Sequence, residues 1–183
     1  MANKAIKIDL NDENNSPFGS LPEWDLGDLY PAENAPELIR DLDWLDKACS
    51  DFAGDYEGKL KTLQAKDLLV AVERYQDIEI VAGRIMSYAG LRYYQLTSDP
   101  QRAKFMSDMQ DKITQLTTPL VFYGLEINRI NDDNLNSILK ENIDLARYKP
   151  VFDRMRAMKP HQLSDELEKF LHDQSVVGSA AWN

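Results

Sequence analysis

Apolar residues recur at steps of three and four along most of the chain, which is the spacing of one face of a helix. The longest such stripe runs from residue 68 to residue 96, about eight helical turns. No run alternates between apolar and polar residues with turn residues at both ends, so the pattern contains no convincing strand. The chain is therefore predicted to be all-α. The members of the longest stripe are Leu68, Ala71, Tyr75, Ile78, Ala82, Ile85, Ala89, Tyr93 and Leu96.

A second long stripe follows after the short break Thr97-Ser98-Asp99-Pro100. Asp99 is suited to cap the new helix and Pro100 to occupy its first position. Two long helices joined by so short a turn must pack antiparallel. The pattern predicts a helical hairpin over about residues 67–128, with Asp67 capping its first helix. The members of the second stripe are Phe105, Met109, Ile113, Leu116, Leu120, Tyr123 and Ile127.

Shorter helices are expected on both sides of the hairpin. One begins near Asn34, has Pro36 in its first turn, and is ended by Gly54 or Gly58. The others fall within about residues 132–183. They are one that holds Leu135, Ile138 and Leu139, one that Pro150 opens and Lys159-Pro160 ends, and one that Ser164 caps.

Two features inside the hairpin need an explanation. Gly83, Ser87 and Gly90 lie close to one face of the first helix, where each glycine costs about 1 kcal/mol relative to alanine. Close approach of a neighbouring backbone would explain them, and a hinge is the alternative. Pro119 falls inside the second helix, where it removes a hydrogen bond and predicts a kink.

The two ends of the chain differ from its middle. Residues 1–20 are polar and broken by proline and glycine, which predicts a flexible tail. Residues 21–31, LPEWDLGDLYP, are too short and broken for a helix and are expected to lie across the surface of another element. A last apolar pattern, which includes Val176, Val177 and Trp182, stops at Asn183 without a cap. We therefore expect residues 21–183 to form one helical region of a chain that is truncated at 183.

Composition narrows the classes of partner. The chain carries 31 acidic and 21 basic residues, a formal net charge of -10. Such a surface repels phosphate backbones and anionic lipids, so neither nucleic acid nor a membrane is expected as partner. The excess is interpreted as a solvated face, and the alternative is a surface that steers cationic peptides. Without a signal peptide or a membrane span, the expected location is the cytoplasm.

The sequence holds no recognisable catalytic motif. His-Glu-x-x-His, G-x-S-x-G, the Walker loop and G-x-G-x-x-G are all missing. Cys49, the single cysteine, is expected to be a buried apolar residue. The best local group is Asp165, Glu168 and His172 on one helical face, which could bind a metal or orient a general base. The alternative, an exposed polar face with a Glu–His pair, is favoured.

Two further groups are weighed in the same way. His161 follows Pro160 in a connection, where hydrogen bonding to backbone is its expected role. Tyr88, Tyr93 and Tyr94 could stack on peptides, but tyrosines on a long helix are more often core residues with a solvated hydroxyl.

Several segments, in order along the chain, resemble oligoendopeptidase F-type metallopeptidases of the thimet-oligopeptidase-like group. They are LPEWDLGDLYP (21–31), RIMSYAGLRYYQLTSDPQRAKF (84–105), LVFYGLEINRI (120–130) and RAMKPHQLSDELEKFLHDQSVVGSAAWN (156–183). The last segment resembles the family's K-P-H-x-L-S-x-E-x-E stretch.

The resemblance implies that the chain is the N-terminal region of a helical zinc endopeptidase that cuts short peptides in an enclosed cleft, one wall of which this region forms. The zinc ligands and general base would lie in a catalytic domain beyond residue 183. No catalytic, cofactor-binding or metal residue is therefore assigned to this chain, and zinc is expected only in the full-length protein. The chain alone should be inactive, with the catalytic domain and short peptides as partners in the whole enzyme. The alternatives are a stand-alone helical interaction module and a metal-dependent enzyme that uses Asp165, Glu168 and His172.

Overall fold

The computed structural model describes residues 24–178, in which every regular element is a helix. The predicted all-α fold, a long hairpin with shorter helices, is confirmed. The expected tail over residues 1–20 lies outside the described residues, and so does Trp182. The elements are α1 (Pro36–Tyr56), η1 (Leu60–Thr62), α2 (Ala65–Gln95), α3 (Pro100–Thr117), η2 (Thr118–Leu120), α4 (Val121–Arg129), α5 (Asp132–Glu141), α6 (Ile143–Ala146), α7 (Lys149–Ala157), η3 (Lys159–His161) and α8 (Asp165–Gln174).

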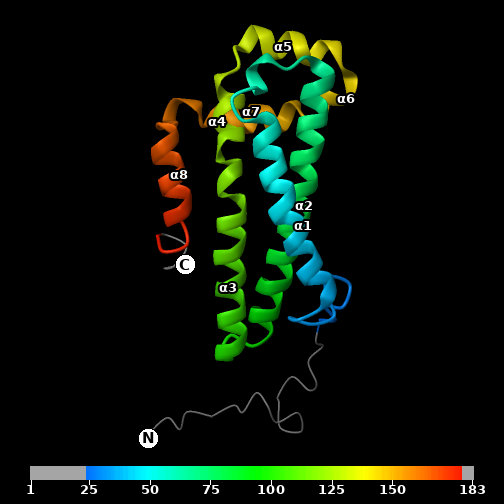
Figure 1. Ribbon diagram of the computed structural model, residues 1–183, viewed down its shortest axis with the longest axis vertical. Helices are drawn as coiled ribbons and strands as arrows, with labels where there is room; N and C mark the ends of the chain where they lie inside the picture. The colour runs from blue at the N-terminus through cyan, green and yellow to red at the C-terminus, as the bar shows by residue number, and fades with distance from the viewer. Residues whose placement is uncertain (1–23, 179–183) are drawn as a thin grey trace, which may run out of the picture.

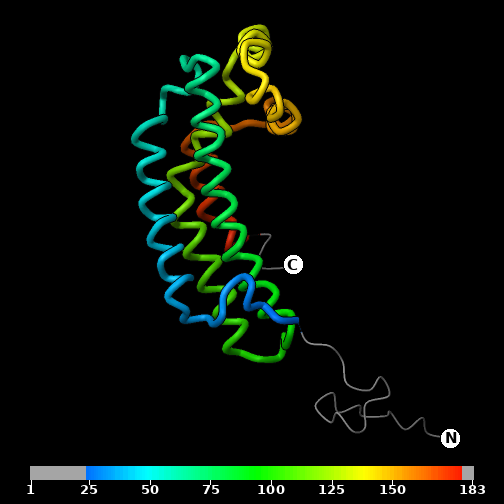
Figure 2. Tube along the Cα trace, turned by 90° about the vertical axis from the view of Figure 1, so that its right-hand side faces the viewer, coloured from blue at the N-terminus to red at the C-terminus, as the bar shows by residue number. Residues whose placement is uncertain are grey.

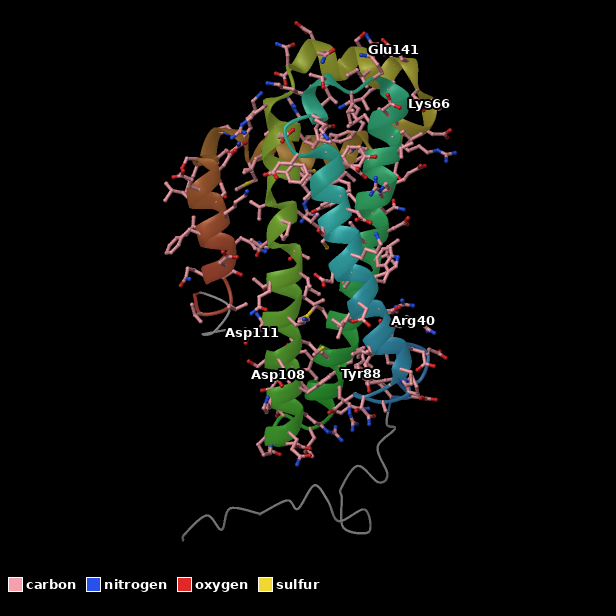
Figure 3. The ribbon with its side chains drawn as sticks, in the orientation of Figure 1. Arg40, Lys66, Tyr88, Asp108, Asp111 and Glu141 are labelled. Atoms are coloured by element: carbon pink, nitrogen blue, oxygen red, sulfur yellow. The ribbon has the colours of Figure 1, made fainter. Side chains whose placement is uncertain are left out.

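The long helices stand side by side and alternate in direction. Figure 1 shows α1 running upward, α2 downward, and α3 followed by α4 upward again. The short helices α5, α6 and α7 cover the end of this bundle where α2 begins, and Figure 2 shows them projecting to one side. Lys66 and Glu141 mark that end in Figure 3, whereas Tyr88 lies in the half nearer the α2–α3 turn. The helix α8 runs downward along the outer side of α3 and α4, away from α1 (Figure 1).

The turn of the hairpin forms as its sequence predicts. The Asp99 side chain accepts hydrogen bonds from the backbone N–H groups of Gln101 and Arg102. The prediction for the other end was wrong, because α2 begins at Ala65 and Asp67 lies within its first turn. At this position the Asp67 carboxylate complements the helix dipole, but it does not cap the helix.

Pro119 interrupts the second arm of the hairpin, as predicted. The arm is regular from Pro100 to Thr117, tightens into the 3₁₀ turn η2, and continues as α4. A proline lacks the N–H that the α-helical ladder needs at this point, so the ladder is broken locally.

An aromatic cluster around Phe52 joins α1, α2 and α4. The Phe52 ring is fully buried. Its centroid lies 4.9 Å from that of Tyr56, 5.8 Å from those of Tyr75 and Tyr123, and 5.9 Å from that of Phe122. Tyr75 and Tyr123 stack with centroids 4.0 Å apart, and burial raises the pKa of both. Such ring contacts stabilise the fold beyond the area that they bury.

A buried carboxylate fixes the connection between α1 and α2. Glu126 of α4 accepts a hydrogen bond from the backbone N–H of Gly58 at 2.5 Å and another from that of Leu60 at 3.1 Å. Gly58 has a φ of 81°, a left-handed conformation that suits glycine at the end of a helix. The carboxylate therefore supplies acceptors for one N–H group of the turn after α1 and for the first N–H group of η1.

The segment before α1 lies across the bundle, as expected for residues that follow the tail. Leu26 and Leu29 pack against the core, and Tyr30 is buried. The Tyr30 hydroxyl donates to Asp41 at 2.6 Å, and burial together with this contact raises the pKa of Tyr30 to about 12. The segment thereby covers the lower end of α1 and α2.

Cys49 is fully buried in α1, which confirms the interpretation of this residue as an apolar one. Burial raises the pKa of its thiol to about 11. The thiolate form, the nucleophile of cysteine chemistry, is therefore strongly disfavoured.

Candidate functional site

The helix α8 packs against the bundle through its polar side. The His172 Nε2 atom lies 3.3 Å from the Thr114 carbonyl oxygen, and the Thr118 hydroxyl donates to Asp173 at 2.6 Å. On the same helix Lys169 pairs with Glu57, the residue that follows α1, at 3.2 Å. None of the α8 residues is buried, so polar contacts, and not apolar ones, hold this helix in place.

Leu167 and Phe170 of α8 face away from the bundle, and Leu171 lies at the edge beside the hairpin. Leu167, Phe170 and Leu171 are spaced at i, i+3 and i+4, so they form a stripe about 100° wide. Each is about half exposed or more, up to 59 % for Phe170, and Leu163 just before the helix is exposed too. We call these four residues the α8 stripe. A surface helix of a globular protein normally turns such a stripe toward the core, so this surface is one that a further element would cover.

A groove of about 680 Å³ lies between α8 and the hairpin, next to the α8 stripe. Its walls are mostly apolar, and Leu171 belongs to both the groove and the stripe. Two carboxylates, Glu79 and Glu168, also line it, and no Lys or Arg within the described range forms an ion pair with either of them. The groove is lined by Tyr75, Glu79, Ala82, Gly83, Met86, Ile113, Thr117, Leu120, Val121, Gly124, Glu168, Leu171 and His172.

The expected reason for the glycines of α2 was wrong. A Cβ atom added to Gly83 would meet nothing within 4 Å, and one added to Gly90 would meet only the Tyr94 ring at 3.8 Å. No neighbouring backbone approaches either position. Gly83 instead leaves open space in the wall of the groove.

The residues singled out for metal binding are not brought together as a site. Asp165 forms an ion pair with Arg129 of α4, whose hydrogen bond lowers the pKa of that carboxyl. Glu168 accepts from the backbone N–H of Leu163 at 2.8 Å, while His172 faces Thr114. Across residues 24–178 no group of three or more His, Cys, Asp or Glu side chains could hold a metal ion. A catalytic zinc site requires three protein ligands around one ion, so these residues do not fit one.

The remaining candidates have mainly structural contacts. His161 is exposed, and its backbone N–H donates to the Met158 carbonyl. Tyr88 is buried and packs edge-on against Tyr30, with centroids 5.4 Å apart. Tyr94 is exposed, whereas Tyr93 is half-buried.

The direction of the α8 stripe was missed from the sequence. Its apolar spacing was visible, but the spacing alone does not say which side of a helix meets the bundle. The contacts that fix this direction join Asp165 and Lys169 to residues far away in the chain, so the sequence carried no local signal for it.

Length and hydropathy decide whether a helix can span a membrane. None of the helices within residues 24–178 is long and apolar enough to cross a bilayer.

The fold and the outward stripe indicate the class of protein: an all-helical region with a surface suited to packing against more protein. Comparison with known proteins then shows what the chain is similar to. A family model described as Oligopeptidase F matches residues 126–183, the part of the chain that includes α8. The predicted resemblance to the N-terminal region of oligoendopeptidase F-type peptidases is thereby confirmed.

Two curated relatives extend the match over most of the chain. Oligopeptidase PepF of Bacillus subtilis (strain 168) is 28% identical over 172 residues, which cover 86% of this chain and 23% of the relative. Group B oligopeptidase PepB of Streptococcus agalactiae serotype III (strain NEM316) is 24% identical over 169 residues, which cover 92% of this chain and 28% of the relative. The chain thus spans about a quarter of the length of these relatives. No solved structure matches.

Proposed function

We propose that this chain is the non-catalytic N-terminal helical part of a zinc-dependent oligoendopeptidase that hydrolyses short peptides, and that it forms one wall of the substrate cleft. The observation that carries the proposal is the extent of the match. Two relatives named as oligopeptidases align with most of this chain, yet the aligned part is only about a quarter of each. The rest of such a protein would hold the zinc and the reacting groups.

Zinc chemistry enters the proposal only through the parent protein. A catalytic zinc polarises the scissile carbonyl and activates a water molecule. The contribution of this chain would be to shape the cleft, to admit short or unfolded peptides, and to keep bulk water out.

The groove beside α8 is the part of the chain that we assign to the cleft wall. It combines an apolar lining with two carboxylates that have no ion-pair partner among the described residues. A peptide lying along it would meet apolar side chains and hydrogen-bond acceptors, the mixture that ligand sites commonly present.

Filling the groove should therefore impair the complete enzyme. Gly83→Trp places a large ring in the groove, and Gly54→Trp is the matched control, because an added Cβ has open space at both helical positions. In the full-length protein we expect Gly83→Trp to lower kcat/KM for a short fluorogenic peptide by about 10-fold or more, since misplaced substrate reacts slowly. The control should leave kcat/KM within about twofold. Equal kinetics for the two variants would show that the groove is not part of the cleft wall.

A further inference from the structure

The α8 stripe is exposed, and the residues on and beside it indicate which kind of element would cover it. We propose that the stripe pairs with an amphipathic helix whose apolar side is flanked by Lys or Arg residues, and that this helix belongs to the remaining length of the protein. The second clause rests on the proposed function, because it requires the chain to be part of a longer protein.

The geometry of the stripe favours a helix as partner. Residues at i, i+3 and i+4 on one helix form the ridges that interlock with the side chains of a second helix. Leu167, Phe170 and Leu171 have this spacing, and Leu163 extends the surface by one further side chain. Removing these large apolar side chains from water is favourable, which suits a permanent contact within a protein.

The charges beside the stripe favour a basic partner. Glu166 lies next to Phe170 on one edge of the stripe, and Glu168 lies next to Leu171 on the other. Neither forms an ion pair with a described Lys or Arg. The one lysine of α8, Lys169, lies on the inner side and pairs with Glu57. A partner helix would therefore meet Glu166 on the open edge and Glu168 at the rim shared with the groove, and Lys or Arg there would complement them.

The same charges disfavour a second copy of the chain as occupant. Two α8 helices packed through their stripes would bring acidic edges together, since the one lysine of α8 is engaged by Glu57. Like charges at such flanking positions oppose pairing. The net charge of -10 adds a long-range repulsion between copies.

Peptide binding tests the chemistry of the partner. The probe is a synthetic helix of about three heptads with Leu at positions a and d and Lys at e and g, and the matched probe has Glu at e and g. We expect the Lys probe to bind the 183-residue chain about 10-fold more tightly than the Glu probe, as measured by fluorescence anisotropy, with a smaller difference at high salt.

Two variants separate pairing at the stripe from general attraction to an acidic protein. Phe170→Ser should weaken binding of the Lys probe by about 10-fold, because it removes the largest apolar contact without changing the charge. Ile143→Ser alters a residue of α6 that is 81% exposed, and it should have no effect. Equal effects of the two variants, or no preference between the probes, would overturn the proposal. So would a dimer in sedimentation equilibrium that Phe170→Ser dissociates.

Thiol labelling tests whether the partner lies in the same protein. Cys49 is fully buried, so in the 183-residue chain a maleimide should report Phe170→Cys almost alone, and in the longer protein peptide mapping identifies the labelled site. We expect rapid labelling in the 183-residue chain and at least about 10-fold slower labelling in the full-length protein, because covered thiols react only on opening. Equal labelling rates would refute the placement of the helix. Peptidase activity of the full-length protein is a separate readout, so failure of this proposal and failure of the proposed function are distinguishable.

Discussion

Replacement of Phe52 by Ala is expected to lower the free energy of unfolding by about 3–5 kcal/mol, a large share of the stability of a domain of this size. The ring is fully buried and contacts four other aromatic rings from α1, α2 and α4. Its removal would leave a cavity at the point where these three helices meet. Urea unfolding followed by circular dichroism measures the change.

Phe170→Ala is the matched control, because the same side chain is removed from an exposed position on α8. Its expected cost is below about 0.5 kcal/mol in the 183-residue chain. Similar losses for the two variants would contradict either the full burial of the Phe52 ring or the outward direction of the α8 stripe.

Replacement of Glu126 by Ala should give the second large effect, a loss of at least about 2 kcal/mol. The buried N–H of Leu60 would lose its acceptor, which costs about 1–3 kcal/mol, and the less buried N–H of Gly58 would add a smaller amount. Glu126→Gln should recover little of this, because an amide offers one acceptor oxygen where two N–H groups need one each. Urea unfolding again provides the measurement.

Glu73→Ala, a substitution at an exposed position of α2, serves as the control for Glu126 and should change stability by less than about 0.5 kcal/mol. If Glu126→Gln were as stable as the unsubstituted chain, the two backbone hydrogen bonds to this carboxylate would not stabilise the α1–α2 connection as described.

The sequence predicted those parts of the fold that depend on local spacing. The stripes of α2 and α3, the Asp99 cap and the interruption at Pro119 all follow from residues close to one another in the chain. The cap of α2 was misplaced by three residues, at Asp67 in place of Gln64, because a good capping residue does not prevent the helix from beginning earlier, at Ala65. Helix ends are weakly determined by single residues.

Features that depend on distant residues were not predictable in this way. Glu126 binds backbone groups 66 and 68 residues away, and its sequence neighbours carry no sign of that contact. The orientation of α8 follows from Glu57, Thr114, Thr118 and Arg129, which come from other parts of the fold. Periodicity identified the apolar residues of α8, but only these polar contacts determine that the stripe faces outward.

The most direct test of the proposed function is the zinc content and peptide cleavage of two purified proteins, the 183-residue chain and the product of the complete reading frame. We expect the longer protein to bind about one zinc ion and to cleave short peptides, and the chain to do neither, because a catalytic zinc needs three protein ligands. Tight one-to-one zinc in the chain, lost on His172→Ala, would contradict this account and favour a metal site in α8. A reading frame that ends at Asn183 would contradict it as well, and would favour a stand-alone helical interaction module.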